Sequence, residues 1–175
     1  MKLKDYQATG FERGASRLRE GLWWVIRSIF FAPWFPVPSA MKVFWLRAFG
    51  AKIGDGVVIR SRVHISFPWR LEIGDFVWIG DEVSILSLDR VVIGSNCCIS
   101  QRAYLCTGSH DFSKDSFDLQ TAPIVIEDEC WVSAMAFVGP GVSMRSGSRC
   151  LAGAVVVREV PRGATVSGVP ARVRA

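Results

Sequence analysis

From residue 53 onward an apolar residue returns at every sixth position, and this period constrains the fold more than any other feature of the chain. Neither an α-helix, with about 3.6 residues per turn, nor a simple alternating strand produces a strict period of six. The period is typical of a hexapeptide β-helix, in which three hexapeptides close one triangular coil. The repeating residues form five sets of three: Ile53, Ile59 and Ile65; Ile73, Ile79 and Ile85; Ile93, Ile99 and Leu105; Ile126, Val132 and Val138; Met144, Cys150 and Val156. We therefore predict an all-β chain built as a parallel β-helix of about five coils.

The corners of each coil should carry residues that accept unusual backbone conformations. Gly with Asp or Asn follows many of the repeating positions, as in Gly54-Asp55-Gly56, Gly74-Asp75 and Ser95-Asn96. These residue types tolerate the tight turns that other residues resist. The repeating aliphatic side chains should point inward and stack about 4.8 Å apart on their counterparts in the next coil. Spacing alone does not determine the hand of the coil.

One long insertion interrupts the repeat. Ile93 and Ile126 occupy equivalent positions but lie 33 residues apart, where one coil accounts for 18. The excess falls within residues 107–123, so we predict a loop there that leaves the β-helix. A long loop on a rigid scaffold is usually functional.

The N-terminal region has a different composition. Residues 1–49 hold eight Lys and Arg against three acidic residues, whereas residues 50–175 hold thirteen of each sign. The stretch 22–49 is rich in Trp and Phe but is broken by prolines and charges, so it is too short to span a membrane. We predict two short helices joined by a Pro-rich turn over Ala32–Pro38. Two interpretations remain open: the helices cap the end of the β-helix, or their aromatic and basic residues lie on a membrane surface.

The predicted organisation is thus a helical arm over residues 1–50 and a β-helix domain over 51–175, with the 107–123 loop and a C-terminal tail over 161–175. Half of the residues are apolar and 21% are charged, which indicates a globular chain. The five cysteines include no CxxC pair, which favours buried apolar cysteines in a reducing compartment. Residues 1–19 lack the apolar segment of a signal peptide. We expect a cytoplasmic protein, with membrane association through the arm as the open alternative.

Several segments resemble the hexapeptide-repeat acetyltransferases, in the maltose, galactoside and nodulation O-acetyltransferase group. The resemblance is greatest to the colanic-acid-type enzymes of exopolysaccharide biosynthesis, and it covers nearly the whole chain. It rests on Arg47-Ala48-Phe49-Gly50-Ala51-Lys52-Ile53-Gly54, Tyr104-Leu105-Cys106-Thr107-Gly108-Ser109-His110-Asp111, Cys130-Trp131-Val132 and Gly168-Val169-Pro170-Ala171-Arg172. It implies a left-handed coil, a homotrimer and an acetyl-CoA-dependent O-acetyltransferase, without a metal, that acts on a sugar or exopolysaccharide precursor.

The same resemblance implies roles for single residues. His110 matches the family's catalytic histidine, and an imidazole suits the removal of a proton from a poorly nucleophilic sugar hydroxyl. Asp111 is a candidate for orienting that imidazole. The backbone N–H of Ala134 is the expected oxyanion donor. The expected CoA contacts are Trp131, Ala134, Ala152, Gly153, Arg158, Pro170 and Arg172, and the expected acceptor contacts are Asp81 and Glu82.

Other functions were weighed against this reading. A zinc-dependent hydratase on the same scaffold needs three imidazoles, and the chain has two histidines, His64 and His110. A nucleic-acid-binding protein has only the basic arm in its favour, without a recognised module. A non-enzymatic structural β-helix and a serine O-acetyltransferase remain alternatives, although the latter usually carries a longer helical N-terminal domain.

Overall fold

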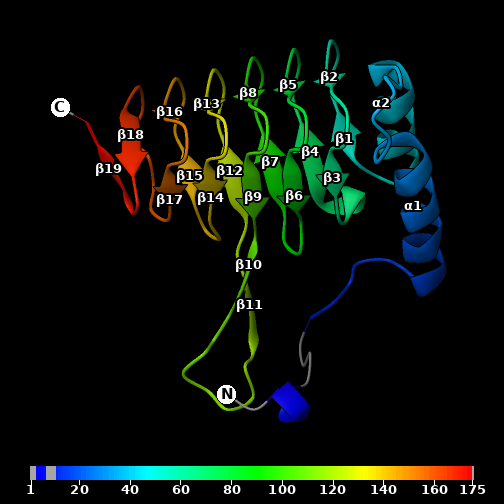
Figure 1. Ribbon diagram of the computed structural model, residues 1–175, viewed down its shortest axis with the longest axis horizontal. Helices are drawn as coiled ribbons and strands as arrows, with labels where there is room; N and C mark the ends of the chain where they lie inside the picture. Colours follow the sequence, from blue (N-terminus) through cyan, green and yellow to red (C-terminus); the bar gives the residue numbers. More distant parts are fainter. Residues whose placement is uncertain (1–2, 7–10, 175) are drawn as a thin grey trace.

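The computed structural model describes residues 3–6 and 11–174. Short parallel strands stack into a three-sided prism, with two helices at one end and a hairpin projecting from its side (Figure 1). Face A contains β1 (Lys52–Ile53), β4 (Leu71–Ile73), β7 (Val91–Ile93), β12 (Ile124–Ile126) and β15 (Ser143–Met144). Face B contains β2 (Val58–Ile59), β5 (Trp78–Ile79), β8 (Cys98–Ile99), β13 (Trp131–Val132), β16 (Arg149–Cys150), β18 (Thr165–Gly168) and β19 (Ala171–Val173). Face C contains β3 (His64–Ile65), β6 (Ser84–Leu86), β9 (Tyr104–Cys106), β14 (Phe137–Val138) and β17 (Val155–Val156).

The strand register confirms the period of six. On face A, Ile53 lies beside Ile73, Ile73 beside Ile93, Ile93 beside Ile126 and Ile126 beside Met144. Faces B and C are stacked in the same way, and every repeating residue predicted to point inward is buried. The five coils continue into a partial sixth, because Val160 bridges to Met144 and β18 pairs with β16.

A second set of core residues lies two positions before the first. Val57, Val63, Val77 and Val83 are buried, and so are their counterparts in the later coils: Cys97, Ala103, Cys130, Ala136, Val142 and Ala154. These residues turn inward at the end of each corner and fill the space between the faces. Burial of each large aliphatic side chain contributes roughly 1.5–3 kcal/mol relative to exposure.

The corner glycines serve two purposes, only one of which was predicted. Gly56 has φ +66°, the left-handed conformation that glycine accepts readily. Gly74 and Gly80 have no positive φ, and their role is to permit close stacking of coils. A Cβ on Gly74 would lie 2.6 Å from Ser95 Oγ and 2.8 Å from Ser95 N, and one on Gly80 would lie 2.6 Å from Gln101 N. The left-handed conformation falls instead two residues after these glycines, at Phe76 and Glu82.

Helices α1 (Arg17–Phe30) and α2 (Ser39–Ala48) cover the first coil. Trp23, Phe31 and Leu46 are fully buried against it. The Trp23 indole N–H donates to the Ile65 carbonyl over 2.9 Å, and the buried Lys42 ammonium donates to the Ile59 and Arg60 carbonyls over 3.2 and 2.6 Å. Because these carbonyls have no coil before them, the helices supply both a cover and hydrogen-bond donors. The capping interpretation is therefore confirmed.

Two short 3₁₀ turns complete the described structure, at Leu3–Asp5 and Pro68–Arg70. Cys98 is half-buried and the other cysteines are buried, and all five are free thiols. Neither α1 nor α2 has the length and hydropathy of a membrane-crossing segment, and the rest of the described chain offers no better candidate.

Candidate functional site

The predicted loop is an antiparallel hairpin that stands out from the prism. Its strands are β10 (Gly108–His110) and β11 (Leu119–Thr121), in which His110 lies opposite Leu119. The hairpin leaves the edge between faces C and A, on the side of the prism away from strands β2, β5 and β8 (Figure 1). An extended stretch ending at His110 pairs more readily with a returning strand than with the already filled coil.

The ring of His110 is held by its own hairpin. Its Nδ1 lies 2.9 Å from the carbonyl oxygen of Phe117. The two rings are stacked, with centroids 4.2 Å apart and planes 1° apart, and Tyr6 meets the imidazole edge-on at 5.7 Å. Because a carbonyl oxygen only accepts, Nδ1 must carry a proton, and in the neutral ring Nε2 is then the basic nitrogen. The hairpin therefore selects the tautomer that a general base requires.

Asp111 does not orient the imidazole, contrary to the sequence-based expectation. Its carboxylate accepts hydrogen bonds from the hydroxyl and the backbone N–H of Ser113, at 2.6 and 3.1 Å. These bonds and the charge of Lys114 lower the pKa of Asp111. Adjacent residues on a strand point to opposite sides, so His110 and Asp111 have different surroundings.

A groove of about 620 Å³ runs over the first three coils along face B and its edge with face C. Both predicted acceptor residues line it, together with Trp78, Ser100 and Arg102. Asp81 accepts from the Ser61 N–H at 3.0 Å and from Arg60 Nε at 3.3 Å. Partial burial tends to raise the pKa of Asp81, but these hydrogen bonds and the Arg60 charge outweigh it and lower the pKa.

Glu82 occupies the left-handed corner position beside Asp81, at φ +60°. Its carboxylate accepts from Arg102 Nε at 3.1 Å and lies 3.8 Å from Arg62. Asp81 and Glu82 thus share the groove with three guanidinium groups, those of Arg60, Arg62 and Arg102. The rim combines oxygen acceptors for hydroxyl groups with cations for a negatively charged substituent.

Ala134 lies at the same B–C edge, in the fourth coil. In the first coil, the equivalent N–H of Ser61 is bonded by the side chain of Asp81 in the coil above. The residue stacked on Ala134 is Ala152, whose methyl group offers no acceptor. Within the described chain no group accepts a hydrogen bond from the Ala134 N–H. This N–H is free to serve an external oxygen.

The predicted CoA contacts follow along this edge and the end of face B. The half-exposed Trp131 indole donates to Ser100 Oγ at 2.8 Å, which fixes it at the end of the groove. Gly153, at φ +69° with open space around its Cα, donates to the Ala134 carbonyl at 2.9 Å. Arg158 and Arg172, 14 residues apart in the chain, line one small cavity of about 130 Å³. Pro170 is exposed and forms a cis peptide bond with Val169, in the turn between β18 and β19.

One chain does not bring all these residues together. Asp81, Glu82, Trp131, Ala134, Ala152 and Gly153 follow face B and its edge with face C, whereas His110 projects from the C–A edge. His110 is not among the residues that line the groove. The imidazole and the free N–H therefore face different sides of the same prism.

Phe117 and Tyr6 were missed by sequence reasoning. The contact of Phe117 with His110 depends on hairpin pairing, and the only signal for it was an aromatic residue within the loop. Tyr6 approaches from more than a hundred positions away, for which the sequence carried no signal.

His64, the other histidine, lies on face C and accepts from Arg27 at 2.9 Å. Burial, followed by the charge of Arg27, lowers the pKa of His64 and keeps it neutral. Over residues 3–6 and 11–174, His, Cys, Asp and Glu side chains form no group of three or more suited to a metal ion.

No family model matches the chain, but individual proteins do. A protein of Escherichia coli (strain K12) named as the colanic acid biosynthesis acetyltransferase WcaF is 42% identical over 160 residues, which cover 91% of this chain and 87% of the relative. Nodulation protein L of Rhizobium meliloti (strain 1021) is 33% identical over 133 residues, covering 74% and 73% of the two chains.

Solved structures share the fold at lower identity. A hexapeptide-repeat acetyltransferase of Vibrio cholerae, complexed with acetyl coenzyme A, superposes with a TM-score of 0.83 at 24% identity, over 97% of this chain and 94% of that one. A galactoside acetyltransferase in complex with coenzyme A gives a TM-score of 0.79 at 20% identity, over 90% and 80%. The stacked coils, the projecting hairpin and the extent of the match to the colanic acid relative agree. The chain belongs to the hexapeptide-repeat acetyltransferases and is an enzyme whose co-substrate is acetyl-CoA.

Proposed function

We propose that this enzyme transfers an acetyl group from acetyl-CoA to a hydroxyl of a sugar or exopolysaccharide precursor, with His110 as the general base. The observation that carries the proposal is the hydrogen bond between His110 Nδ1 and the Phe117 carbonyl. It leaves Nε2 as the proton acceptor on a hairpin that extends away from its own prism. The printed name of the Escherichia coli relative supports an exopolysaccharide precursor as acceptor.

The proposed step is direct transfer. Nε2 of His110 takes the hydroxyl proton as the oxygen attacks the thioester carbonyl, and the Ala134 N–H donates to the oxyanion that forms. The C–S bond then breaks, and the thiolate of CoA receives the proton from His110 to leave as the thiol. Both the charge and the proton are accounted for without a covalent enzyme intermediate.

The co-substrate fits the chain at the groove end and the last coils. Trp131 would border the acetyl and pantetheine part, Ala152 and Gly153 would offer backbone contacts, and Arg158 with Arg172 would meet phosphate. Pro170 would lie beside the adenine. The paired placement of Arg158 and Arg172 around one cavity supports an anionic ligand there. Asp81 and Glu82 would accept hydrogen bonds from the acceptor's hydroxyl groups.

We further propose a homotrimer in which each active site lies between two subunits. His110 and Ala134 lie on different edges of one prism, so neighbouring prisms are needed to bring a hairpin against a B–C edge. Most soluble oligomers have closed symmetry, and a ring of prisms would complete a site at every interface.

The decisive experiment is a CoA-release assay across free sugars, nucleotide sugars and lipid-linked oligosaccharides. The expected result is acetyl transfer to a hydroxyl of one class, lost on substitution of His110. Acetylation of an amine alone, or of the serine hydroxyl alone, would contradict the proposal. The serine O-acetyltransferase alternative predicts the latter result.

A further inference from the structure

The two helices at the end of the prism carry a second apolar surface in addition to the one that covers the first coil. On α1, Leu18, Leu22, Val25 and Ile29 recur at spacings of four, three and four, which places them on one side of the helix. Their side chains are between 51% and 74% exposed. The side that packs on the coil is a different one, represented by Trp23. Covering the β-helix therefore does not explain the outer stripe.

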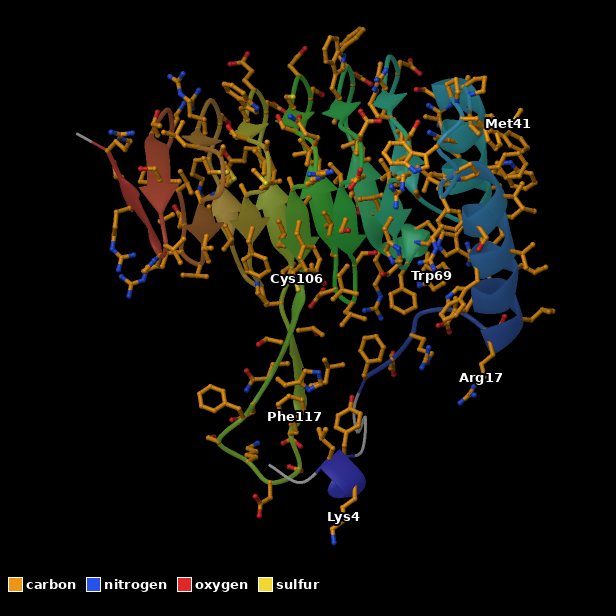
Figure 2. The ribbon with its side chains drawn as sticks, viewed as in Figure 1. Lys4, Arg17, Met41, Trp69, Cys106 and Phe117 are labelled. Carbon is orange, nitrogen blue, oxygen red and sulfur yellow. The ribbon has the colours of Figure 1, made fainter. Side chains whose placement is uncertain are left out.

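Helix α2 and the connecting turn extend this surface. Trp34 and Phe35 in the turn and Met41 and Phe44 on α2 are also large, apolar and exposed. Figure 2 shows side chains of both helices projecting away from the coils, with Met41 at the outer side. We call these four residues and the α1 stripe the end face. Single exposed apolar residues are common, but eight on two adjacent helices and their turn indicate a surface with a partner.

The charges around the end face favour an anionic partner. Residues 11–50 contain six basic residues against Glu12 and Glu20. Glu20 is ion-paired with Arg13 at 2.6 Å, and the nearby Asp55 lies 3.5 Å from Arg47. Arg17 is exposed at the start of α1.

The end face also has the side-chain chemistry of a membrane interface. Arg62 lies 4.4 Å above the exposed Trp34 ring. Aromatic residues next to cations, on short amphipathic helices, are the composition of surfaces that rest in a lipid headgroup layer.

We propose that the end face docks the enzyme onto an anionic lipid bilayer. The apolar side chains would enter the headgroup boundary while the basic residues contact lipid phosphates. The helices lie across the end of the prism, so docking leaves faces A, B and C free of lipid (Figure 1). A folded protein partner is less favoured, because its interface would normally include acceptors for these arginines.

A consequence concerns the acceptor, and it rests on the proposed function, whereas the docking does not. A second hollow of about 540 Å³ runs between the turn at Trp34 and Asp81, past Lys42. It shares Val58, Arg60 and Asp81 with the groove. A head group anchored in the bilayer would therefore have a continuous path from the end face to the acceptor residues. This path favours an acceptor carried by a membrane lipid through a phosphate group.

The docking is tested by co-sedimentation of the full chain with phosphatidylcholine vesicles, with and without phosphatidylglycerol. The test variant is Leu22→Gln/Ile29→Gln/Phe44→Gln. The matched control is Phe112→Gln, which removes an equally exposed phenylalanine from the hairpin tip. We expect the wild type and the control to bind the anionic vesicles, and the triple variant to bind at least ~10-fold more weakly. Binding should also weaken as salt is raised.

Each other outcome overturns the proposal. These are equal binding by the triple variant, no binding by the wild type, or equal binding to neutral vesicles. Concentration-dependent association that the triple variant loses, without vesicle binding, would show instead that the end face joins copies of this chain. Thermal stabilisation by acetyl-CoA, measured on every variant, confirms folding and keeps failure of the docking distinct from failure of acetyl transfer.

Discussion

His110 is the residue whose replacement should remove the most activity with the least structural change. His110→Ala removes the proton acceptor from a half-exposed hairpin, so turnover should fall by roughly 10²–10⁴. Acetyl-CoA binding should persist, because its proposed contacts lie on other edges of the prism. Turnover in the CoA-release assay and calorimetric titration with CoA measure the two effects. A variant with near-normal turnover would show that another group takes the proton.

Asp111 provides the contrasting case at the neighbouring position. Its carboxylate bonds Ser113 rather than the imidazole, so Asp111→Asn should change turnover little. Phe117→Ala removes the stacked ring while retaining the carbonyl, and should lower turnover by an intermediate amount. Comparing kcat for the two variants separates the partner that holds His110 from the partner that merely follows it. A larger loss in Asp111→Asn would restore the sequence-based expectation.

Coil stacking makes a prediction about glycine at the scale of structural elements. Gly74→Ala places a Cβ against the backbone of Ser95, which cannot move without shifting a coil, and should destabilise the protein by roughly 1–3 kcal/mol. Gly21→Ala is the matched control, because nothing lies within 4 Å of that position on α1. Removing a helical glycine should stabilise the protein by about 0.5–1 kcal/mol. Urea unfolding measures both, and a similar sign for the two would contradict the stacking argument.

An ionic network ties the fourth coil to the two that follow. Glu127 accepts from Arg145 at 2.9 Å and from the Ser146 N–H at 2.9 Å, and Arg145 also bonds Glu159 at 3.0 Å. These contacts, with the Arg145 hydrogen bond largest, lower the pKa of Glu127 from its ordinary value of 4.5. The folded state therefore holds this proton less tightly than the unfolded state. Its contribution to stability is present above that value and is lost as the pH falls through the folded-state pKa.

Glu127→Gln tests this contribution. The free energy of unfolding of the variant should lie below that of the wild type at neutral pH, and the difference should shrink on acidification below about pH 4.5. Urea titrations at several pH values measure the difference. Lys52→Gln is a suitable control, because its ion pair with Glu72 is long, at 3.4 Å, and mostly exposed. A pH-independent difference would mean that Glu127 acts through packing and not through charge.

The whole molecule predicts that active sites are shared between subunits. His110→Ala and Ala134→Pro each remove one half of the site, the base and the N–H respectively, and each should be nearly inactive alone. If the two halves come from different chains, subunits mixed at random should regain about a quarter of the wild-type activity. If one chain contained a complete site, mixing would restore nothing. Sedimentation of each variant and of the mixture verifies that all remain trimeric and exchange subunits.

The period of six was sufficient to predict the stacked coils, the inward columns and the place where the chain leaves them. Each hexapeptide repeats one local rule, an inward aliphatic followed by a corner, so the prediction needs no knowledge of distant contacts. The motif around Thr107–Asp111 placed His110 at the start of the excursion for the same local reason. The second core layer, at positions such as Val77, follows the same period and was readable but not read.

Only the tertiary structure decided which groups act on one another. Pairing between His110 and Leu119 brings the Phe117 carbonyl to the imidazole, and stacking of Ala152 on Ala134 leaves an N–H without an acceptor. Both depend on backbone atoms of residues far enough apart that no local pattern encodes their approach. The same holds for α1, whose sequence shows apolar residues but not that Trp23 faces the coil while Leu22 faces outward. Local hydrophobic patterns determine the elements, whereas contacts between elements depend on how side chains of several segments fill one space.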